Sequence, residues 1–420
     1  MTQVHKRFTD DQLRSLFRAY EDGQIDRAQI EEVLGIGKTR FFALWKLFRK
    51  DPSHFSISYH RDSPHRMAKS REEVIRAFLL EERALIEDPS LPISSFNYSA
   101  IRDRLRDRGI DVSLPTIIDR AKKLGCHRSR PKKKAHDREV ITTAVGALIQ
   151  HDASFHRWSP YAESKWTLIS SLDDYSRKLL FADFFEHETT WAHLQAAEAL
   201  TRRYGLPLQY YVDSLRVFRY VHSRDSAWYK TVLKTDDIDP QWKQTLGLLG
   251  INIIYALSPQ AKGKIERSYR WLQDRIVRTA AREKLTSITD MRQILKEEVV
   301  RYNHQRVHAT TGEIPHVRFQ TALRTGKSLF RPFSLPAPYA NPKDIFCLRE
   351  TRAVNAYRRI EFHHHTVPMP RVPIGEDVEI HIIPDLTRGS LQTRFWWKQT
   401  LVQSIVFPLK EFPRVHFWTL

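Results

Sequence analysis

Cysteine and long apolar runs are scarce in this chain of 420 residues. The two cysteines, Cys126 and Cys347, cannot build a disulfide framework or a cysteine-rich zinc site, so any metal would be held mainly by oxygen or imidazole ligands. The longest apolar runs, such as residues 141–149, are far too short to span a bilayer. The first residues lack the apolar segment of a signal peptide, and we expect a cytoplasmic protein without a membrane partner.

Positive charge is in large excess. Lysine and arginine number 68 against 49 aspartate and glutamate, which gives a formal net charge of +19 and a pI near 9.9. A charge of this size indicates a polyanionic partner, either nucleic acid or an acidic membrane surface. Apolar residues make up 41% of the chain, which is enough to build buried cores, and the length predicts roughly two to four domains.

Residues 1–55 have the pattern of a three-helix unit. Apolar side chains recur at helix spacing in three segments, and a short glycine-containing turn at 35–37 separates the second segment from the third. The third helix opens with Lys38, Thr39 and Arg40, which places cationic and hydroxyl groups where a recognition helix meets a DNA groove. The pattern is typical of a helix-turn-helix domain, with Lys38 and Arg40 as candidate DNA contacts.

Residues 66–126 repeat this organisation. We expect three helices, over 71–87, 99–107 and 113–124. The last of them carries Arg120 and Lys122 as candidate DNA contacts of a second helix-turn-helix domain. The basic, proline-interrupted stretch 127–138 is interpreted as a linker, which either is simply solvated or contacts phosphates. Two such units in one strongly basic chain favour DNA as the partner.

After residue 139 the pattern changes to strands that end in acids. We expect strands over 145–153, 166–173, 178–185, 206–213 and 251–257, and helices over 189–204 and 258–284. Asp152 and Asp213 end two of these strands, and Glu266 lies in the first turn of the last helix. An acid at the end of a buried strand costs desolvation energy unless a cation or hydrogen-bond donors compensate it. Three converging carboxylates would hold two Mg²⁺ or Mn²⁺ ions for an in-line displacement at phosphorus.

Several motifs within residues 139–325 resemble those of bacterial insertion-sequence transposases and retroviral-type integrases with a DDE catalytic core. Residues 258–267, Ser-Pro-Gln-Ala-Lys-Gly-Lys-Ile-Glu-Arg, are similar to the helix entry around the family's glutamate. Residues 172–177, Leu-Asp-Asp-Tyr-Ser-Arg, resemble its second-strand turn, and residues 302–315 resemble the helix and loop that close its core. The resemblance implies a central α/β ribonuclease-H-like core with a five-stranded mixed sheet.

The resemblance also implies roles for single residues. It makes Asp152, Asp213 and Glu266 the catalytic and metal-binding triad, and it gives the acids at 173–174 a structural role in a turn. Four cations at the helix entry would contact DNA: Lys262, Lys264, Arg267 and Arg270. The implied activity is two-metal-ion cleavage and strand transfer at the ends of a mobile element. It would be carried out in a bacterium, near the nucleoid, by a homo-oligomer assembled on double-stranded element ends and target DNA.

Residues 342–420 favour short strands. The alternation predicts strands over 353–362, 366–368, 377–383 and 396–406, which together suggest a small β-barrel. The three histidines at 363–365 would point to opposite sides of an alternating strand, which argues against a shared metal. The mixed cations and aromatics at 394–398 either stack on bases or fill the core. The whole chain is therefore predicted to be a multidomain α+β protein.

Two other functions stay open at this stage. Where the family usually continues its second aspartate with Asn-Gly, this chain has Asp213-Ser-Leu-Arg, and the interval to Glu266 is longer than in retroviral relatives. The extra length around 223–244 predicts an insertion after the fourth strand. A transposase-derived DNA-binding protein that has lost catalysis is therefore one alternative, and a nuclease of the same fold that never joins strands is another.

Overall fold

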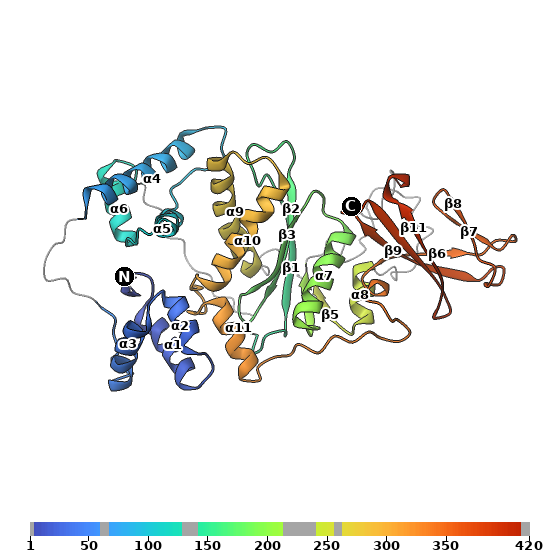
Figure 1. The fold of residues 1–420 in the computed structure, drawn as a ribbon, viewed down its shortest axis with the longest axis horizontal. Helices are drawn as coiled ribbons and strands as arrows, with labels where there is room; N and C mark the ends of the chain where they lie inside the picture. Colours follow the sequence, from blue (N-terminus) through green and yellow to red (C-terminus); the bar gives the residue numbers. More distant parts are fainter. Residues whose placement is uncertain (1–3, 59–66, 128–141, 213–240, 256–262, 413–420) are drawn as a thin grey trace.

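The computed structural model describes residues 4–58, 67–127, 142–212, 241–255 and 263–412 (Figure 1). Two helical units lie at one end, a sheet covered by helices occupies the middle, and antiparallel strands lie at the other end. Within the described residues, no helix is long and apolar enough to cross a membrane. The chain therefore has the predicted α+β organisation.

The first unit contains three short helices. They are α1 (Asp10–Glu21), α2 (Arg27–Leu34) and α3 (Lys38–Lys50). Capping boxes begin α1 and α2, and Gly35 ends α2 in the left-handed conformation, which glycine adopts without a steric penalty. The buried side chains of the three helices form one core. This core is extended by Ile314, the N-cap of helix α11 (Pro315–Arg324), and by Val317 of that helix. This unit therefore packs against the central domain.

The second unit has the predicted three helices with boundaries shifted by one or two residues. They are α4 (Lys69–Glu87), α5 (Tyr98–Asp107) and α6 (Leu114–Lys123). Ser113 caps α6 as its pattern predicts, since its hydroxyl accepts from the Thr116 amide at 3.3 Å. Eight buried apolar residues from the three helices and the segment before α6 form a core separate from that of the first unit.

The central domain contains a five-stranded mixed sheet in the order β3-β2-β1-β4-β5. Its strands are β1 (Ile149–His156), β2 (Trp166–Asp173), β3 (Leu179–Phe185), β4 (Gln209–Val212) and β5 (Asn252–Tyr255). Strand β2 is antiparallel to both of its neighbours, β1 and β3, whereas β4 runs parallel to both β1 and β5. The prediction of a five-stranded mixed sheet is confirmed, although β4 and β5 are shorter than the apolar runs indicate.

Helices cover both faces of this sheet (Figure 1). Helix α7 (Thr190–Tyr204) and helix α8 (Gln241–Leu248) pack on one face, around Tyr210 and Trp242. Helix α9 (Gly263–Glu283) and helix α10 (Ile288–His304) pack on the other, where β2 and β3 contribute Leu168 and Phe184 to a second core. Helix α8 begins within the stretch 223–244, where the sequence predicts an insertion, and residues 223–240 of that stretch are outside the described part of the chain.

The C-terminal strands form an open sheet, and the predicted small β-barrel is not found among the described residues. The strands are β6 (Leu348–Ala353), β7 (Arg359–Phe362), β8 (His365–Pro368), β9 (Asp377–Asp385), β10 (Ser390–Trp397) and β11 (Thr400–Pro408). Four of them make a sheet in the order β11-β10-β9-β6, while β7 and β8 pair separately. Since β6 and β11 are the two edges of the larger sheet, no ladder closes it.

Two turns in this region differ from the predicted strands. Lys398 and Gln399 both have positive φ and join β10 to β11 as a tight hairpin, where the sequence predicts one continuous strand. His363, also at positive φ, and His364 form the turn between β7 and β8, and His365 is the first residue of β8, so the three histidines do not lie on one continuous strand. The aromatics at 395–396 are buried, and Trp396 donates to the Asp344 carboxylate at 3.0 Å. They belong to the core of this sheet.

Candidate active site

The first half of β1 and the first turns of α9 are joined by two hydrogen bonds. The Ile265 amide donates to Oε1 of Gln150 at 3.1 Å, and the Tyr269 hydroxyl donates to the Asp152 carbonyl at 2.5 Å. The two contacts are two residues apart on β1, about 7 Å, and four residues apart on α9, about 6 Å. Strand and helix therefore run side by side over this span, and Glu266 lies on α9 between the two contacts.

The buried Asp174 carboxylate fixes the helix entry. It accepts from Thr142 at 2.8 Å and from Gln150 at 2.7 Å, and it forms ion pairs with Arg177 at 3.0 Å and with Lys264 at 2.7 Å. A carboxylate with no exposed surface needs such partners, because an uncompensated buried charge is costly. The network links β1, the turn after β2 and the start of α9, which is the helix that carries Glu266.

The neighbouring Asp173 shapes the turn itself. Its carboxylate accepts from the Gly146 amide at 2.9 Å and from the amide and hydroxyl of Ser176 at 2.8 and 2.6 Å. Burial raises the pKa of Asp173 to about 6, although these hydrogen bonds act in the opposite direction. Both acids of the motif are thus tied into the turn, in the structural role that the sequence pattern implies.

Two of the three predicted catalytic acids are described. Asp152 and Glu266 are both half-buried, on β1 and α9 respectively. Asp213 follows directly after β4 and, like Lys262, lies outside the described residues. Over the part of the chain that the structure describes, no group of three or more histidine, cysteine or acidic side chains is placed to hold a metal ion. The triad as a whole is therefore still a prediction.

The register of the sheet places Asp152 inside β1. In the parallel ladder of β1 and β4, Ile149 lies opposite Tyr210 and Gln150 lies opposite Tyr211. Strand β4 ends one residue later, at Val212, whereas β1 continues to His156 alongside β2, and Asp152 lies opposite Ser170 of β2. The prediction that Asp152 ends its strand is therefore wrong, because the antiparallel ladder with β2 extends the strand by four more residues.

The predicted DNA contacts fall into two groups. Lys38, Arg40, Lys122, Arg267 and Arg270 are exposed, at the start of α3, the end of α6 and the beginning of α9. Arg120 instead bridges α6 to α4, because its guanidinium pairs with Glu72 at 2.5 Å and with Asp119 at 2.6 Å. Lys264 pairs with Asp174 as described above. For both of these side chains the structure provides an acidic partner within the protein.

The surface beside Arg267 is strongly positive. Burial, together with the guanidinium groups of Arg306, Arg177 and Arg267, lowers the pKa of His308 to about 4. A neutral histidine surrounded by several arginines marks a region whose potential favours an anion. This region lies next to the start of α9.

The second helical unit docks on the outer side of α9. Arg278 pairs with Glu82 and with Asp274, the latter at 2.9 Å, and it donates to the Ser95 carbonyl at 2.5 Å. Arg275 pairs with Asp103 at 2.6 Å. Burial raises the pKa of Glu82 even with these cations beside it. A small apolar patch, made by Leu91, Ile93, Val277 and Ala281, completes the contact.

Sequence reasoning missed the residues that connect the elements of this site. Gln150 and Tyr269 are not members of the predicted triad. Gln150 of β1 accepts from the Ile265 amide of α9 and donates to the Asp174 carboxylate, and Tyr269 of α9 donates to the Asp152 carbonyl of β1. One signal was available for Gln150, because a glutamine directly after Leu148 and Ile149 in an apolar strand needs a buried partner. Nothing in the sequence identifies that partner as Asp174.

Comparisons with known proteins place the chain near transposases. No family model matches it. The chain is 29% identical over 296 residues to y4bF of Sinorhizobium fredii (strain NBRC 101917 / NGR234), whose name assigns it to the transposases. It is 31% identical over 179 residues to the transposase for insertion sequence IS1202 of Streptococcus pneumoniae. The matches cover 69% and 43% of this chain but only 59% and 35% of the relatives, so the chain spans little more than half of one and about a third of the other.

Solved structures that match the chain include retroviral integrases. The catalytic core domain of BIV integrase overlaps 43% of this chain and 98% of its own, with 19% identity and a TM-score of 0.29. The HTLV-2 integrase catalytic core domain, in complex with magnesium, overlaps 43% and 97%, with 13% identity and a TM-score of 0.30. The relationship of this chain to transposases accordingly comes from the sequence matches.

Proposed function

We propose that this chain is a member of the transposase and integrase family, and that it cleaves DNA at the ends of a mobile element and joins those ends to target DNA. The observation that carries the proposal is the junction of β1 with α9. Two hydrogen bonds, from Ile265 to Gln150 and from Tyr269 to Asp152, hold the strand that bears one predicted catalytic acid against the helix that bears another. Asp152 and Glu266, which are distant in the sequence, therefore lie on adjacent elements.

The donor set suits a divalent cation. Carboxylate oxygens are the ligands that Mg²⁺ and Mn²⁺ prefer, and Asp152 and Glu266 are half-buried acids on adjacent elements. Asp152, Asp213 and Glu266 would hold the ions in our proposal. Bound ions would neutralise charge on the phosphate and lower the pKa of an attacking hydroxyl group.

The proposed chemistry is two successive displacements at phosphorus. In the first, a water oxygen attacks the phosphorus at the element end, the P–O bond to the 3′ oxygen breaks, and a 3′-hydroxyl is released. In the second, this 3′-hydroxyl attacks a phosphorus of the target strand, and the 3′ oxygen of the target leaves. The protein residues orient the groups, and the Asp174 network keeps the helix of Glu266 in place while they react.

The two helical units would recognise the element ends. Lys38 and Arg40 are exposed at the start of α3, after the Gly35 turn, which is where a helix-turn-helix protein contacts a groove. Lys122 is exposed at the end of α6, while Arg120 would stabilise that unit through Glu72. Joining two ends requires two active sites, so we propose that a homo-oligomer assembles on double-stranded DNA.

A strand-transfer assay tests the proposal. Purified protein is incubated with a labelled element-end duplex, a target plasmid and Mg²⁺ or Mn²⁺. Asp152→Asn and Glu266→Gln should each reduce joined product by at least about a hundredfold, because removing an activating group of this kind typically costs two or more powers of ten. Glu283→Gln is the matched control, since this exposed glutamate ends the same helix.

The alternatives give different products in the same assay. If the native protein and Asp152→Asn give equal amounts of joined product, or if neither gives any, the proposed enzymatic activity is excluded. The chain would then be a DNA-binding protein of transposase descent. Nicked plasmid without joined product, in the presence of a free 3′-hydroxyl end, would identify a nuclease instead.

A further inference from the structure

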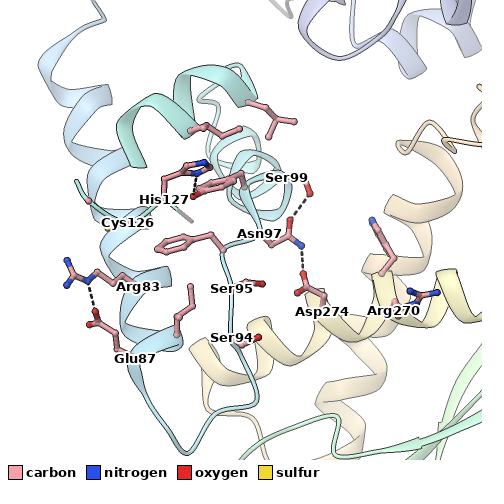
Figure 2. Close-up of a pocket in the computed structure, with 17 residues that line it drawn as sticks. Arg83, Glu87, Ser94, Ser95, Asn97, Ser99, Cys126, His127, Arg270 and Asp274 are labelled. Atoms are coloured by element: carbon pink, nitrogen blue, oxygen red, sulfur yellow. Dashed lines mark hydrogen bonds and ion pairs between the residues drawn. The ribbon is translucent and has the colours of Figure 1, made fainter. Parts of the chain in front are cut away.

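A cavity of about 910 Å³ lies between part of the second helical unit and α9 (Figure 2). The segment that leads from α4 into α5 forms one wall of it, with Ser94, Ser95, Asn97 and Ser99 along its length, and Arg270 and Asp274 of α9 lie opposite. Its volume is at the upper end of the roughly 300–1,000 Å³ typical of ligand sites. The cavity therefore has room for more than one small planar group.

Aromatic rings line the wall that belongs to the helical unit. Phe96 stacks on Tyr98, with ring centroids 5.7 Å apart and an interplanar angle of 7°. His127 continues the row at 5.8 Å from Tyr98, and the Tyr98 hydroxyl shares a hydrogen bond of 3.0 Å with its Nδ1. All three rings are half-buried rather than enclosed in the core. Such a row offers stacking surface to a flat, uncharged ring.

The opposite wall carries a cation. Arg270 is exposed on α9, one helical turn beyond Glu266, and it also lines a smaller cavity of about 200 Å³ next to the first. The other charged groups in the cavity have partners within the protein: Arg83 pairs with Glu87 at 2.7 Å, and Asp274 pairs with Arg278. The guanidinium of Arg270 is therefore well placed to receive an anionic group of a ligand whose flat part lies against the rings.

We propose that this cavity binds unpaired nucleotides of the DNA strand adjacent to the cleaved phosphodiester. Their bases would stack on the row of Phe96, Tyr98 and His127, and Arg270 would bind a phosphate. A paired base has its faces covered by its neighbours in the duplex, so stacking on these rings selects nucleotides that have left the double helix. The inference rests on the proposed function, since it identifies the adjacent strand as the ligand, but binding itself requires no catalysis.

Fluorescence anisotropy in the Glu266→Gln protein tests this directly, because that variant should bind without cleaving. Two labelled duplexes of equal length are compared, one blunt and one with a fork of unpaired thymidines at its end. We expect the fork to bind more tightly, and Phe96→Leu to weaken fork binding about tenfold while leaving blunt binding unchanged. Tyr98→Phe keeps the ring and should retain fork binding. Tyr357→Leu removes an aromatic that is 83% exposed in the C-terminal region and serves as the matched control.

Some results would overturn the inference. An unchanged preference for the fork in Phe96→Leu, or an equal loss in Tyr357→Leu, would show that the row of rings does not bind bases. Circular dichroism checks that each variant is folded. Photocrosslinking of 5-iodouracil in the fork provides a second measurement, and crosslinks that avoid residues 94–99 would contradict the proposal. If strand transfer is absent yet fork binding depends on Phe96, only the proposed function fails; if strand transfer occurs without any fork preference, only this inference fails.

Discussion

Breaking the ion pair between Arg278 and Glu82 should detach the second helical unit from α9. The side chains are 3% and 1% exposed, and Arg278 also holds the Ser95 carbonyl and Asp274. Arg278→Met leaves the Glu82 carboxylate buried beside Arg282, at 3.7 Å, and the Asn97 amide, at 3.5 Å. Removing one partner of a buried pair typically costs about 3–5 kcal/mol. We expect a loss of this size in the free energy that holds the unit in place.

Hydrogen exchange of residues 88–97 measures this loss locally, because the segment lies between α4 and α5 and its Leu91 and Ile93 pack on α9. Since about 1.4 kcal/mol corresponds to a factor of ten, amides of this segment should exchange at least about a hundredfold faster in Arg278→Met. Arg202→Met breaks an exposed pair with Glu198 on α7 and should change exchange little, because surface pairs contribute about 0–1 kcal/mol.

The double variant and the pH dependence test the electrostatic reasoning. Glu82→Leu combined with Arg278→Met removes both charges, so it should be clearly less destabilised than the sum of the single variants. Burial raises the pKa of Glu82 in the folded protein. Ionising this buried carboxyl therefore costs free energy of folding, a cost that is absent below the pKa of glutamate in the unfolded chain and grows as the pH rises above it. The loss in Arg278→Met should therefore be smaller at pH 5 than at pH 8. A change in exchange below tenfold, or additive single variants, would refute the reasoning.

Two further predictions follow from buried charges elsewhere. Lys264→Met should lower strand transfer at least about tenfold but leave the salt dependence of DNA binding unchanged, because Lys264 pairs with Asp174. If Lys264 contacted a phosphate, the substitution would instead reduce the slope of log affinity against log salt concentration by about one. Lys296→Met, which removes an exposed lysine, is the charge-matched control. In the C-terminal sheet, burial alone would lower the pKa of His381, but hydrogen bonds with Asp344, Cys347 and Glu379 outweigh it and raise the pKa to about 10. Its contribution to stability is complete below about pH 6.5 and is lost as pH rises through 10, so thermal denaturation should show a decline across this range that His381→Gln abolishes.

Local patterns predicted most elements because each has its own signal. The alternating and apolar run at 166–173 matches β2 residue for residue, and Ser113 begins α6 as a cap should. The hairpin of β10 and β11 was missed because Lys398 and Gln399 take positive φ without the glycine or asparagine that usually indicates such a turn. The barrel prediction failed for a related reason, since alternation gives the number of strands but not whether the outer ones pair.

The candidate site was predictable only in part. Spacing and resemblance point to Asp152 and Glu266, which the structure places on adjacent elements. The sequence does not reveal that Lys264 and Arg120 have acidic partners, because a cation in a helix looks the same whether it faces solvent or a carboxylate from a distant segment. Arg275 and Arg278 have the appearance of a solvated helix face for the same reason, yet both are buried.

Helix α9 connects the parts that these contacts reveal. Its first turns carry Glu266 and contact β1, its middle carries Arg275 and Arg278, which hold the second helical unit, and Arg270 faces the cavity between them. A helix of 21 residues is about 32 Å long and, being hydrogen-bonded throughout, moves largely as one body. A force that DNA exerts on the helical unit can therefore reach Glu266, the catalytic acid of our proposal, through α9. If our proposals hold, recognition of an element end and positioning of Glu266 are mechanically linked, and variants that loosen the unit should reduce strand transfer even though they touch no catalytic residue.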